Sequence, residues 1–266
     1  MTWLAKLHGK FLVVKLGGNA MLSEDLLVSF AQDIAAVRRA GILVAVVHGG
    51  GPQITRALEN SGIPSSFVDG LRVTPLEAMP IIQDVLMNQI SMPLVELLEQ
   101  SGIEAKALNG ITEDLFIAEV TKPELGRVGE VFAVRDGYLR EIMQTGVVPV
   151  ISSMAPAEDG RLVNVNADLA AAAVAISLGA EELVMLTDVD GLYADFPNKE
   201  SLIAQLTVSE LEKLLPTLES GMLPKVEACL TACFGGVKLA RIVNGSVEHP
   251  ISKLEQDQNL GTTITA

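Results

Sequence analysis

The sequence is poor in aromatic side chains, cysteine and histidine. Of its 266 residues only 4% are aromatic, two are cysteine and three are histidine, whereas 49% are hydrophobic. The core must therefore consist mainly of Ala, Val, Leu and Ile, a composition that favours an α/β fold with parallel strands over an all-β sandwich. A chain of this length can form one large domain or two lobes that share a cleft.

The two cysteines are too few for a disulfide framework or a zinc site. Cys229 and Cys233 stand four residues apart in a helical pattern, which places them on one helix face. A structural zinc ion needs four nitrogen or sulfur ligands, and only His8, His48 and His249 are available elsewhere. We expect two buried free thiols and no metal site.

Clusters of positive charge and long apolar runs are also missing. The formal net charge is −14, from 19 basic and 33 acidic residues, so a nucleic-acid partner is not expected. Apolar runs such as 42–47 and 147–151 are far shorter than the roughly 20 residues that cross a bilayer, and residues 1–10 lack the core of a signal peptide. The sequence predicts a cytoplasmic protein without membrane contact.

One pattern occurs twice near the start of the chain: a buried strand, a glycine loop and a helix. The strand at 11–16 ends at Gly17-Gly18, and the strand at 42–47 ends at residues 49–51, which are all glycine. Such loops let backbone N–H groups converge on an anion at a helix N-terminus. Because adjacent parallel strands end at the same edge of a sheet, we expect both loops to meet there.

The remaining pattern continues the α/β alternation. We expect further helices at 74–100, 136–145, 168–179, 208–215 and 224–234, the first of them opened by Thr74 and Pro75 and kinked at Pro93. We expect further strands at 103–108, 115–120, 128–134, 147–153, 162–166, 183–186, 238–243 and 262–265. The strands at 115–120 and 128–134 should form a hairpin. No linker separates the halves. The prediction is a largely parallel open sheet sandwiched by helices, with two lobes, 1–179 and 180–266, sharing one continuous sheet.

The long helix at 74–100 carries an apolar stripe. It consists of Leu76, Met79, Val85, Leu86, Ile90, Leu94, Leu97 and Leu98. The stripe can pack on the sheet, and surplus apolar surface on it would favour pairing with a second copy of the chain. We expect a homodimer.

Two lysines stand where a positive charge is costly. Lys15 ends an otherwise apolar strand, where its ammonium group needs an open cleft or an anion. Lys225 falls in the first turn of a predicted helix, where the helix dipole disfavours a cation unless negative charge is near. Each lysine alone could simply lie at the surface.

Arg72, Asn164, Asn166 and Asp168 are further candidates. Arg72 lies in a loop before a helix, and its planar fork could hold a carboxylate through two hydrogen bonds. Asn164 and Asn166 are expected on one side of a strand, with Asp168 at the following helix start. Capping alone explains Asp168, but it does not explain the asparagine pair.

Familiar nucleotide and hydrolase motifs do not match. The chain has no G-x-x-x-x-G-K-[ST] after a strand and no G-x-G-x-x-G opening a helix. The stretch 48–51 (HGGG) resembles the oxyanion loop of lipase-like hydrolases, but no G-x-S-x-G supplies a nucleophile.

Taken together, six ordered motifs resemble the amino-acid kinase family almost from end to end. They are 14–21 (VKLGGNAM), 47–52 (VHGGGP), 70–74 (GLRVT), 164–168 (NVNAD), 187–191 (TDVDG) and Gly221-Met222 followed by Lys225. The resemblance implies ATP-dependent phosphorylation of the side-chain carboxylate of a small acylated amino acid, with N-acetyl-L-glutamate as the expected acceptor in arginine biosynthesis.

The resemblance also implies the site residues. Lys15 and Lys225 would stabilise the transferring phosphoryl group and Asp168 would orient them; Gly17, Gly18 and Gly49 would bind phosphate; Gly50, Gly51, Arg72 and Asn164 would hold the acylated amino acid; Asp188, Val189, Gly191, Leu192 and Tyr193 would border the nucleotide in the C-terminal lobe. ATP is the expected nucleotide, and Mg²⁺ would be held mainly by its phosphates rather than by a protein cage.

Phosphorylation of a carboxylate is compatible with these site residues. A glutamate-like carboxylate has a pKa of about 4.3, so at neutral pH it is already a nucleophile and needs no general base. The obstacle is bringing one anion against another, which calls for cations, oriented N–H groups and in-line positioning. The small number of histidines is therefore no objection.

One segment differs from the family pattern and leaves other functions open. Where the family commonly shows Ser-Gly-x-Asp, residues 109–112 read Asn-Gly-Ile-Thr, and this segment bears on substrate contact. One alternative is a kinase for aminoadipate or glutamate linked to a carrier protein, although a basic rim for such a carrier is missing. Another is a sensor of amino acids or nucleotides without catalysis, against which the retention of both lysines and Asp168 argues.

Overall fold

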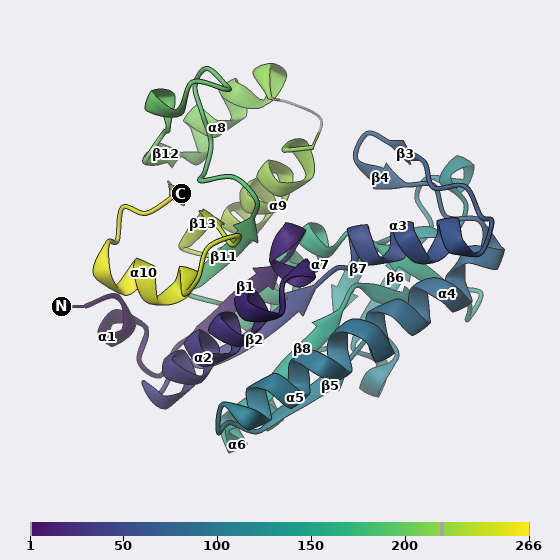
Figure 1. The fold of residues 1–266 in the computed structure, drawn as a ribbon, viewed down its shortest axis with the longest axis horizontal. Helices are drawn as coiled ribbons and strands as arrows, with labels where there is room; N and C mark the ends of the chain where they lie inside the picture. Colours follow the sequence, from purple (N-terminus) through teal and green to yellow (C-terminus); the bar gives the residue numbers. More distant parts are fainter. Residues whose placement is uncertain (1, 219–220, 266) are drawn as a thin grey trace.

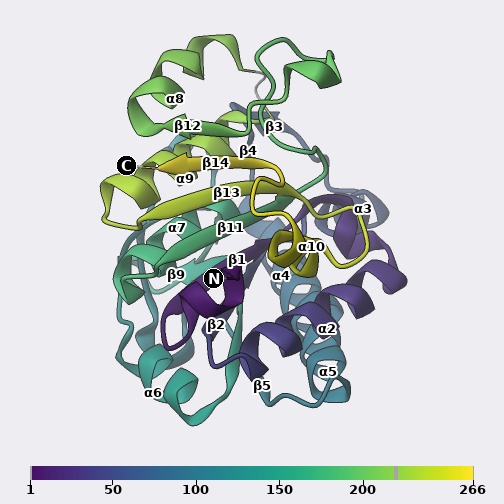
Figure 2. The ribbon, with the colours of Figure 1, turned by 90° about the vertical axis from the view of Figure 1, so that its left-hand side faces the viewer.

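The computed structural model describes residues 2–218 and 221–265, and its centre is an eight-stranded sheet with helices on both faces (Figures 1 and 2). The strands follow in the order β12 (Gln205–Thr207), β14 (Thr262–Thr265), β13 (Leu239–Asn244), β11 (Glu182–Thr187), β1 (Phe11–Leu16), β2 (Leu43–His48), β8 (Val148–Ser152) and β5 (Ala105–Leu108). Every pair is parallel except β13 with β14. The predicted α/β class is confirmed.

Two layers of helices bury the two faces of this sheet. The described α-helices are α1 (Trp3–Leu7), α2 (Glu24–Arg39), α3 (Gly51–Asn60), α4 (Met79–Asp84), α5 (Met92–Gln100), α6 (Gly137–Thr145), α7 (Ala167–Leu178), α8 (Val208–Leu214), α9 (Leu223–Phe234) and α10 (Pro250–Gln256). One core cluster joins the sheet to α2, α5 and α10, and a second joins it to α6, α7 and α9 (Figure 2). The strands before residue 179 form one half of the sheet and the later strands form the other.

Alternation along β1 decides which layer each side chain meets. Leu12 and Val14 belong to the cluster on the α2 side, whereas Val13 belongs to the cluster on the α7 side. Because side chains on a strand alternate between faces, Lys15 shares the face of Val13. The last charged residue of β1 is therefore directed toward α7 and α9.

Two smaller sheets lie beyond the main one. Their strands are β3 (Phe67–Val68) with β4 (Leu71–Arg72), and β6 (Phe116–Glu119), β7 (Val128–Val134), β10 (Leu162–Val165) and β9 (Met154–Pro156). The strands β6 and β7 pair antiparallel, so the predicted hairpin is confirmed. Figure 1 shows β3 and β4 as a separate projection above α3.

The stretch predicted as one helix at 74–100 is more complicated. A 3₁₀ helix at Leu76–Ala78 precedes the α-helix, which begins at Met79. The Thr74 hydroxyl does not cap a helix, since it donates to the Arg72 carbonyl. A π-helix, η3 (Val85–Ser91), separates α4 from α5, and Pro93 follows it in the first turn of α5. Proline has no N–H and its ring collides with the carbonyl four residues earlier, so a wider turn before it relieves the clash.

The elements that the sequence did not reveal are short. They are α1, α10, β9, β12, the pair β3–β4, the 3₁₀ helices and the π-helix at Val85–Ser91, none longer than seven residues. Such segments carry too few residues to display a helical or alternating period. In the described part of the chain, none of the helices has the length and apolarity that crossing a bilayer requires.

Cys229 and Cys233 are both free and buried in α9, as predicted. Burial raises the pKa of both thiols, so they remain protonated packing groups.

Candidate active site

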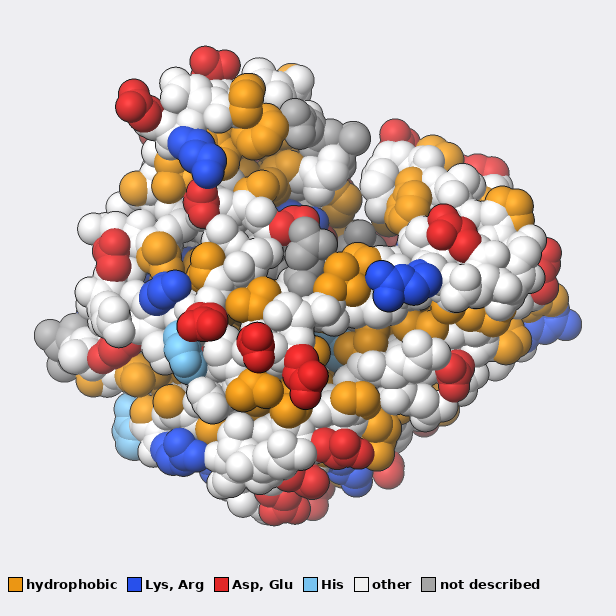
Figure 3. Space-filling view, in the orientation of Figure 1, with side chains coloured by type: hydrophobic (Ala, Val, Ile, Leu, Met, Phe, Trp, Pro, Cys, Tyr) orange, Lys and Arg blue, Asp and Glu red, His pale blue; other side chains and the backbone are white. Residues whose placement is uncertain are grey.

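A cleft of about 200 Å³ opens at the carboxyl ends of β1 and β2. Figure 3 shows the molecule hollowed between the part that carries α8 and the part that carries β3 and β4. Nine of the predicted site residues line the cleft: Lys15, Gly17, Gly18, Gly49, Gly50, Gly51, Arg72, Asn164 and Asp168. The two glycine loops thus meet at one edge of the sheet, as their position after adjacent parallel strands predicts.

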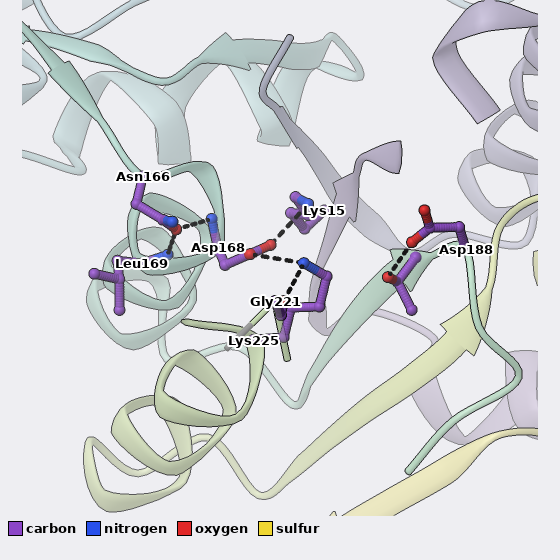
Figure 4. Close-up of polar contacts among 8 residues, drawn as sticks. Lys15, Asn166, Asp168, Leu169, Asp188, Gly221 and Lys225 are labelled. Atoms are coloured by element: carbon purple, nitrogen blue, oxygen red, sulfur yellow. Dashed lines mark hydrogen bonds and ion pairs between the residues drawn. The ribbon is translucent and has the colours of Figure 1, made fainter. Parts of the chain in front are cut away.

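Asp168 joins the two predicted lysines. Lys15 Nζ lies 2.7 Å from one carboxylate oxygen of Asp168, and Lys225 Nζ lies 3.5 Å from the other (Figure 4). The three side chains come from β1, α7 and α9, and their exposed fractions are 8%, 7% and 20% for Lys15, Asp168 and Lys225. Residues more than 200 positions apart therefore form one charged group at the cleft.

The balance of charge at this group is positive. Burial by itself would raise the pKa of the Asp168 carboxyl, but the charges of Lys15 and Lys225 outweigh it and hold that pKa below its usual range. One carboxylate thus faces two ammonium groups, which leaves a surplus positive charge beside the cleft. This surplus, together with the N-terminal end of α7, favours an anion in the cleft.

The cap of α7 is Asn166 rather than Asp168. The Asn166 side-chain oxygen accepts hydrogen bonds from the backbone N–H groups of Asp168 (2.8 Å) and Leu169 (3.2 Å). The explanation of Asp168 as a cap was therefore wrong, and so was the placement of Asn166 on a strand, because β10 ends at Val165. With the helix end satisfied by Asn166, the carboxylate of Asp168 is available to the lysines.

The first glycine loop leaves room for the Lys15 side chain. A Cβ atom added to Gly17 would overlap with Lys15 Nζ, although the extended backbone at Gly17 would accept any residue. Gly18 has a φ of +69°, in the left-handed region that favours glycine. Glycine at the first position thus leaves the Lys15 ammonium group where it is, and glycine at the second suits the backbone conformation.

Arg72 lies in β4 rather than in a loop, and its fork already has partners. Its Nη2 donates to the Gly51 carbonyl (2.8 Å) and to the Thr55 hydroxyl (2.9 Å), and its Nη1 donates to the Ser65 hydroxyl. The guanidinium carbon is 4.6 Å from the centre of the Phe67 ring. Among the described residues no carboxylate lies within 4.0 Å of Arg72, so its positive charge is not neutralised by a protein anion.

Asn164 reaches the cleft from β10. Its Nδ2 donates to the Thr74 hydroxyl at 3.2 Å, which fixes the orientation of the amide. Thr74 is itself buried and bonded to the Arg72 carbonyl. The strand that bears Asn164 and the hairpin that bears Arg72 are thereby tied together on one side of the cleft.

The residues predicted to border the nucleotide do not line this cleft. Asp188, Val189, Gly191, Leu192 and Tyr193 follow β11 at the same edge of the sheet. Asp188 accepts a hydrogen bond from Thr187 (Figure 4) and lies beside the first loop, since a Cβ on Gly18 would be 3.4 Å from its Cγ. The side chain of Leu192 is buried in the core, so only its backbone could face a ligand.

Several cleft residues escaped the sequence analysis. Ser153, Phe67, Met21 and Val128 all line the cleft. Ser153 directly follows β8, the neighbour of β2, and is the last residue of the strand predicted at 147–153. Its position at the same edge of the sheet was therefore a usable signal. Phe67 lies in a two-residue strand that no periodicity could reveal.

Comparisons with known proteins identify the family to which this sequence is similar. Residues 10–244 match the model of the amino acid kinase family. An acetylglutamate kinase of Streptomyces coelicolor is 48% identical, covering 99% of this chain and 89% of the relative, and one of Mycolicibacterium smegmatis is 44% identical, covering 100% and 94%.

Solved structures share the fold. N-acetylglutamate synthase from Neisseria gonorrhoeae, complexed with coenzyme A and N-acetyl-glutamate, superposes with a TM-score of 0.87 at 23% identity, over 99% of this chain but only 61% of the synthase chain. Carbamate kinase from Giardia lamblia bound to AMP-PNP superposes with a TM-score of 0.68 at 19% identity, over 97% and 98% of the two chains. At these identities the likeness concerns the fold alone.

Proposed function

This chain belongs to the amino acid kinase family, and we propose that it transfers the γ-phosphoryl group of ATP to the side-chain carboxylate of N-acetyl-L-glutamate. The products are an acyl phosphate and ADP, and the step belongs to arginine biosynthesis. The family predicted from the motifs is confirmed, and the name of the similar relatives supports the acceptor.

The observation that carries the proposal is the convergence of Lys15 and Lys225 on Asp168 between two glycine loops. A phosphoryl group that moves between two anions spreads negative charge over its oxygens. The group Lys15–Asp168–Lys225 supplies a surplus positive charge at a fixed place, and the loops supply backbone N–H groups. Preorganised charge of this kind lowers the barrier without a general base.

On the acceptor side we assign Gly50, Gly51, Arg72 and Asn164 to the acylated amino acid. Arg72 offers an unneutralised guanidinium group in the wall of the cleft, suited to the carboxylate that does not react. Asn164 offers an amide held in one orientation, suited to the acyl or amino group. The reacting carboxylate would then point toward Lys15 and the glycine loops.

On the donor side we assign Gly17, Gly18 and Gly49 to the phosphates, and the loop from Asp188 to Tyr193 to the rest of the nucleotide. This loop lies beside Gly18, so a nucleotide over it would extend its phosphates toward Lys15. The division assigns acceptor binding to residues 1–179 and ATP binding to residues 180–266.

The residues present fit a magnesium ion that is held by ATP. Asp168, the one carboxylate among the described cleft-lining residues, has both oxygens within reach of lysines. Among the described residues no cluster of three or more His, Cys, Asp or Glu could hold a metal. When bound with ATP, Mg²⁺ would neutralise charge on the phosphate oxygens.

Trapping of the product tests the proposal. Incubation with ATP, Mg²⁺, N-acetyl-L-glutamate and hydroxylamine should yield the hydroxamate of the acid, together with one ADP per hydroxamate. Product from a carrier-linked aminoadipate or glutamate, but none from the free acid, would favour the carrier-dependent kinase. Absence of turnover with every acid would favour a non-catalytic sensor.

A homodimer in the cytoplasm stays a prediction. Most of the apolar stripe is used within the chain, since Met79, Val85, Leu86, Ile90, Leu94 and Leu98 are buried in its own core. Leu76 is 53% exposed and is therefore a residue of the stripe that a second copy could cover. Sedimentation analysis of the purified chain measures its oligomeric state.

A further inference from the structure

His48 is a buried polar residue for which the proposed reaction has no chemical use. It ends β2, directly before the second glycine loop, and its exposed fraction is 0%. By strand alternation it shares the face of Val44 and Val46, on the α2 side of the sheet, opposite to the face of Lys15. The ring therefore lies behind the glycine loop, on the face of the sheet away from Asp168.

Both ring nitrogens of His48 have partners. Nδ1 lies 2.9 Å from the carbonyl oxygen of Gly49, and Nε2 lies 2.7 Å from the hydroxyl oxygen of Ser91 in the π-helix η3. A carbonyl can only accept, so Nδ1 carries the proton and Nε2 accepts from Ser91. Burial lowers the pKa of His48 to about 4, and the charge of Lys15 acts in the same direction, which keeps the ring neutral.

The bond to Nδ1 fixes the peptide between Gly49 and Gly50. In a trans peptide the C=O and N–H groups point in opposite directions. Because the Gly49 carbonyl points toward the His48 ring, the Gly50 N–H points away from it, toward the cleft that Gly50 lines. Among the described residues the Gly50 N–H has no hydrogen-bond acceptor, so it is available to an anion.

The loop itself has no side chain that could hold this orientation. A Cβ atom on Gly49 would lie 3.1 Å from the Ala167 Cβ, and one on Gly50 would lie 2.6 Å from the Ile90 side chain. The loop is thus squeezed between the start of α7 and the π-helix, where only glycine fits without displacement. Glycine peptides are conformationally permissive, and an external bond is needed to select one orientation.

We propose that His48 is a positioning residue, which holds the Gly49–Gly50 peptide so that the Gly50 N–H faces the reacting anions. The hydroxyl of Ser91 in the π-helix satisfies the other ring nitrogen, and the bond from Nδ1 to the Gly49 carbonyl is the one that sets the peptide. The inference rests on the proposed kinase reaction for its catalytic consequence, whereas its structural part concerns the orientation of one peptide.

Two substitutions separate the two bonds of the ring. In His48→Asn the side-chain amide can occupy the place of Nδ1 and donate to Gly49, whereas in His48→Gln the amide reaches the place of Nε2 and contacts only Ser91. Loss of one oriented donor to a developing oxyanion costs about 100- to 1000-fold in kcat. We expect His48→Gln to lose about 100-fold in kcat with KM for ATP changed less than about fivefold, and His48→Asn to lose less than about fivefold.

Ser91→Ala is the matched control, because it removes the bond to Nε2 and leaves the bond to Gly49. Its kcat should stay within about threefold of the parent chain. Thermal unfolding of all three variants measures how far each substitution lowers Tm. Equal kcat for His48→Asn and His48→Gln, or losses of kcat that follow the losses of Tm, would overturn the positioning role.

Crystal structures of the two His48 variants test the orientation without turnover. The Gly49 carbonyl should keep its direction in His48→Asn and turn in His48→Gln, and an unchanged carbonyl in His48→Gln would refute the inference. If the parent chain forms no acyl phosphate from any acid, the proposed function fails while this structural test still decides the role of His48.

Discussion

Two buried carboxylates at opposite edges of the same sheet have opposite electrostatic settings. At the carboxyl edge Asp168 faces Lys15 and Lys225, and the lysines lower its pKa despite burial. At the amino edge Glu182 begins β11 and pairs with Arg241, 2.5 Å away, and there burial prevails over the arginine and raises its pKa. Both carboxylates are almost fully buried, so burial does not distinguish them.

The two carboxylates differ in how many cations lie beside them and in whether those cations have other acceptors in the protein. The second oxygen of Glu182 accepts from the Trp3 indole at 2.9 Å, and Arg241 also donates to the Gln258 carbonyl and the Thr263 hydroxyl. This pair is neutral, and the Nε and Nη1 donors of Arg241 are used within the protein. The Asp168 group keeps one positive charge in excess beside a cleft, so a buried ion pair indicates a ligand site when its charges do not cancel.

The largest expected effect comes from removing a cation at the carboxyl edge. Lys225→Ala should lower kcat about 1000-fold while KM for the acid changes only a few-fold, because the charge is needed mainly in the transition state. Lys238→Ala is the control, since Lys238 also pairs with a carboxylate, Glu181 at 2.9 Å, but its side chain is 71% exposed. Steady-state kinetics decide the matter, and a change confined to KM would contradict the role of Lys225.

Neutralising each carboxylate in turn tests the comparison directly. Asp168→Asn should lower kcat at least about 100-fold and the free energy of unfolding by about 3 kcal/mol, because the buried ammonium group of Lys15 and the partly buried one of Lys225 lose their counter-charge. Glu182→Gln should leave kcat within about twofold and cost about 1–2 kcal/mol, since Arg241 keeps two other acceptors. Urea unfolding and kinetics give both quantities, and equal kcat losses would remove the distinction between the two edges.

Filling the space beside Lys15 should have a smaller effect on kcat. Gly17→Ala should lower kcat about 10- to 100-fold, because the new methyl group displaces the Lys15 ammonium group from Asp168. Gly137→Ala is the control, as its Cβ would meet nothing within 4 Å and it lies at the start of α6. A Gly17→Ala enzyme with the activity of the Gly137→Ala enzyme would show that Lys15 tolerates displacement.

The smallest effect is the dependence of stability on pH, which should have opposite signs at the two edges. The lowered pKa of Asp168 stabilises the fold above the unfolded value of about 3.9, and this contribution is lost as pH falls through the folded value. The raised pKa of Glu182 gives a contribution present below about 4.3 that is lost as pH rises through the folded value.

The measurement is the free energy of unfolding against pH for the parent, Asp168→Asn and Glu182→Gln. The difference between parent and Asp168→Asn should grow as pH rises toward about 4, whereas the difference between parent and Glu182→Gln should shrink as pH rises above about 4.3. Slopes of the same sign would contradict the opposite shifts.

The sequence predicted the main strands and the longer helices because each has a clear period. The strand at 11–16 and the helix after its glycine loop were recognisable from the pattern of apolar residues, and the structure has β1 at Phe11–Leu16 and α2 at Glu24–Arg39. The capping of α7 was misassigned, because Asn166 and Asp168 are both good capping residues and only the backbone conformation selects one. The π-helix was missed because its wider turn follows from packing around Pro93 rather than from any period in residues 85–91.

By itself, the sequence determined the kinds of groups in the site and the edge of the sheet to which the glycine loops belong. Those properties follow from residue types and from strand direction, which are local. The family resemblance implied that Asp168 orients Lys15 and Lys225, and the tertiary structure shows both lysines at its carboxylate. The tertiary structure alone decided that Arg72 is already bonded to its own chain and that His48 is tied to Ser91. Contacts between distant segments depend on how the helices pack on the two faces of the sheet, and no local pattern records that packing.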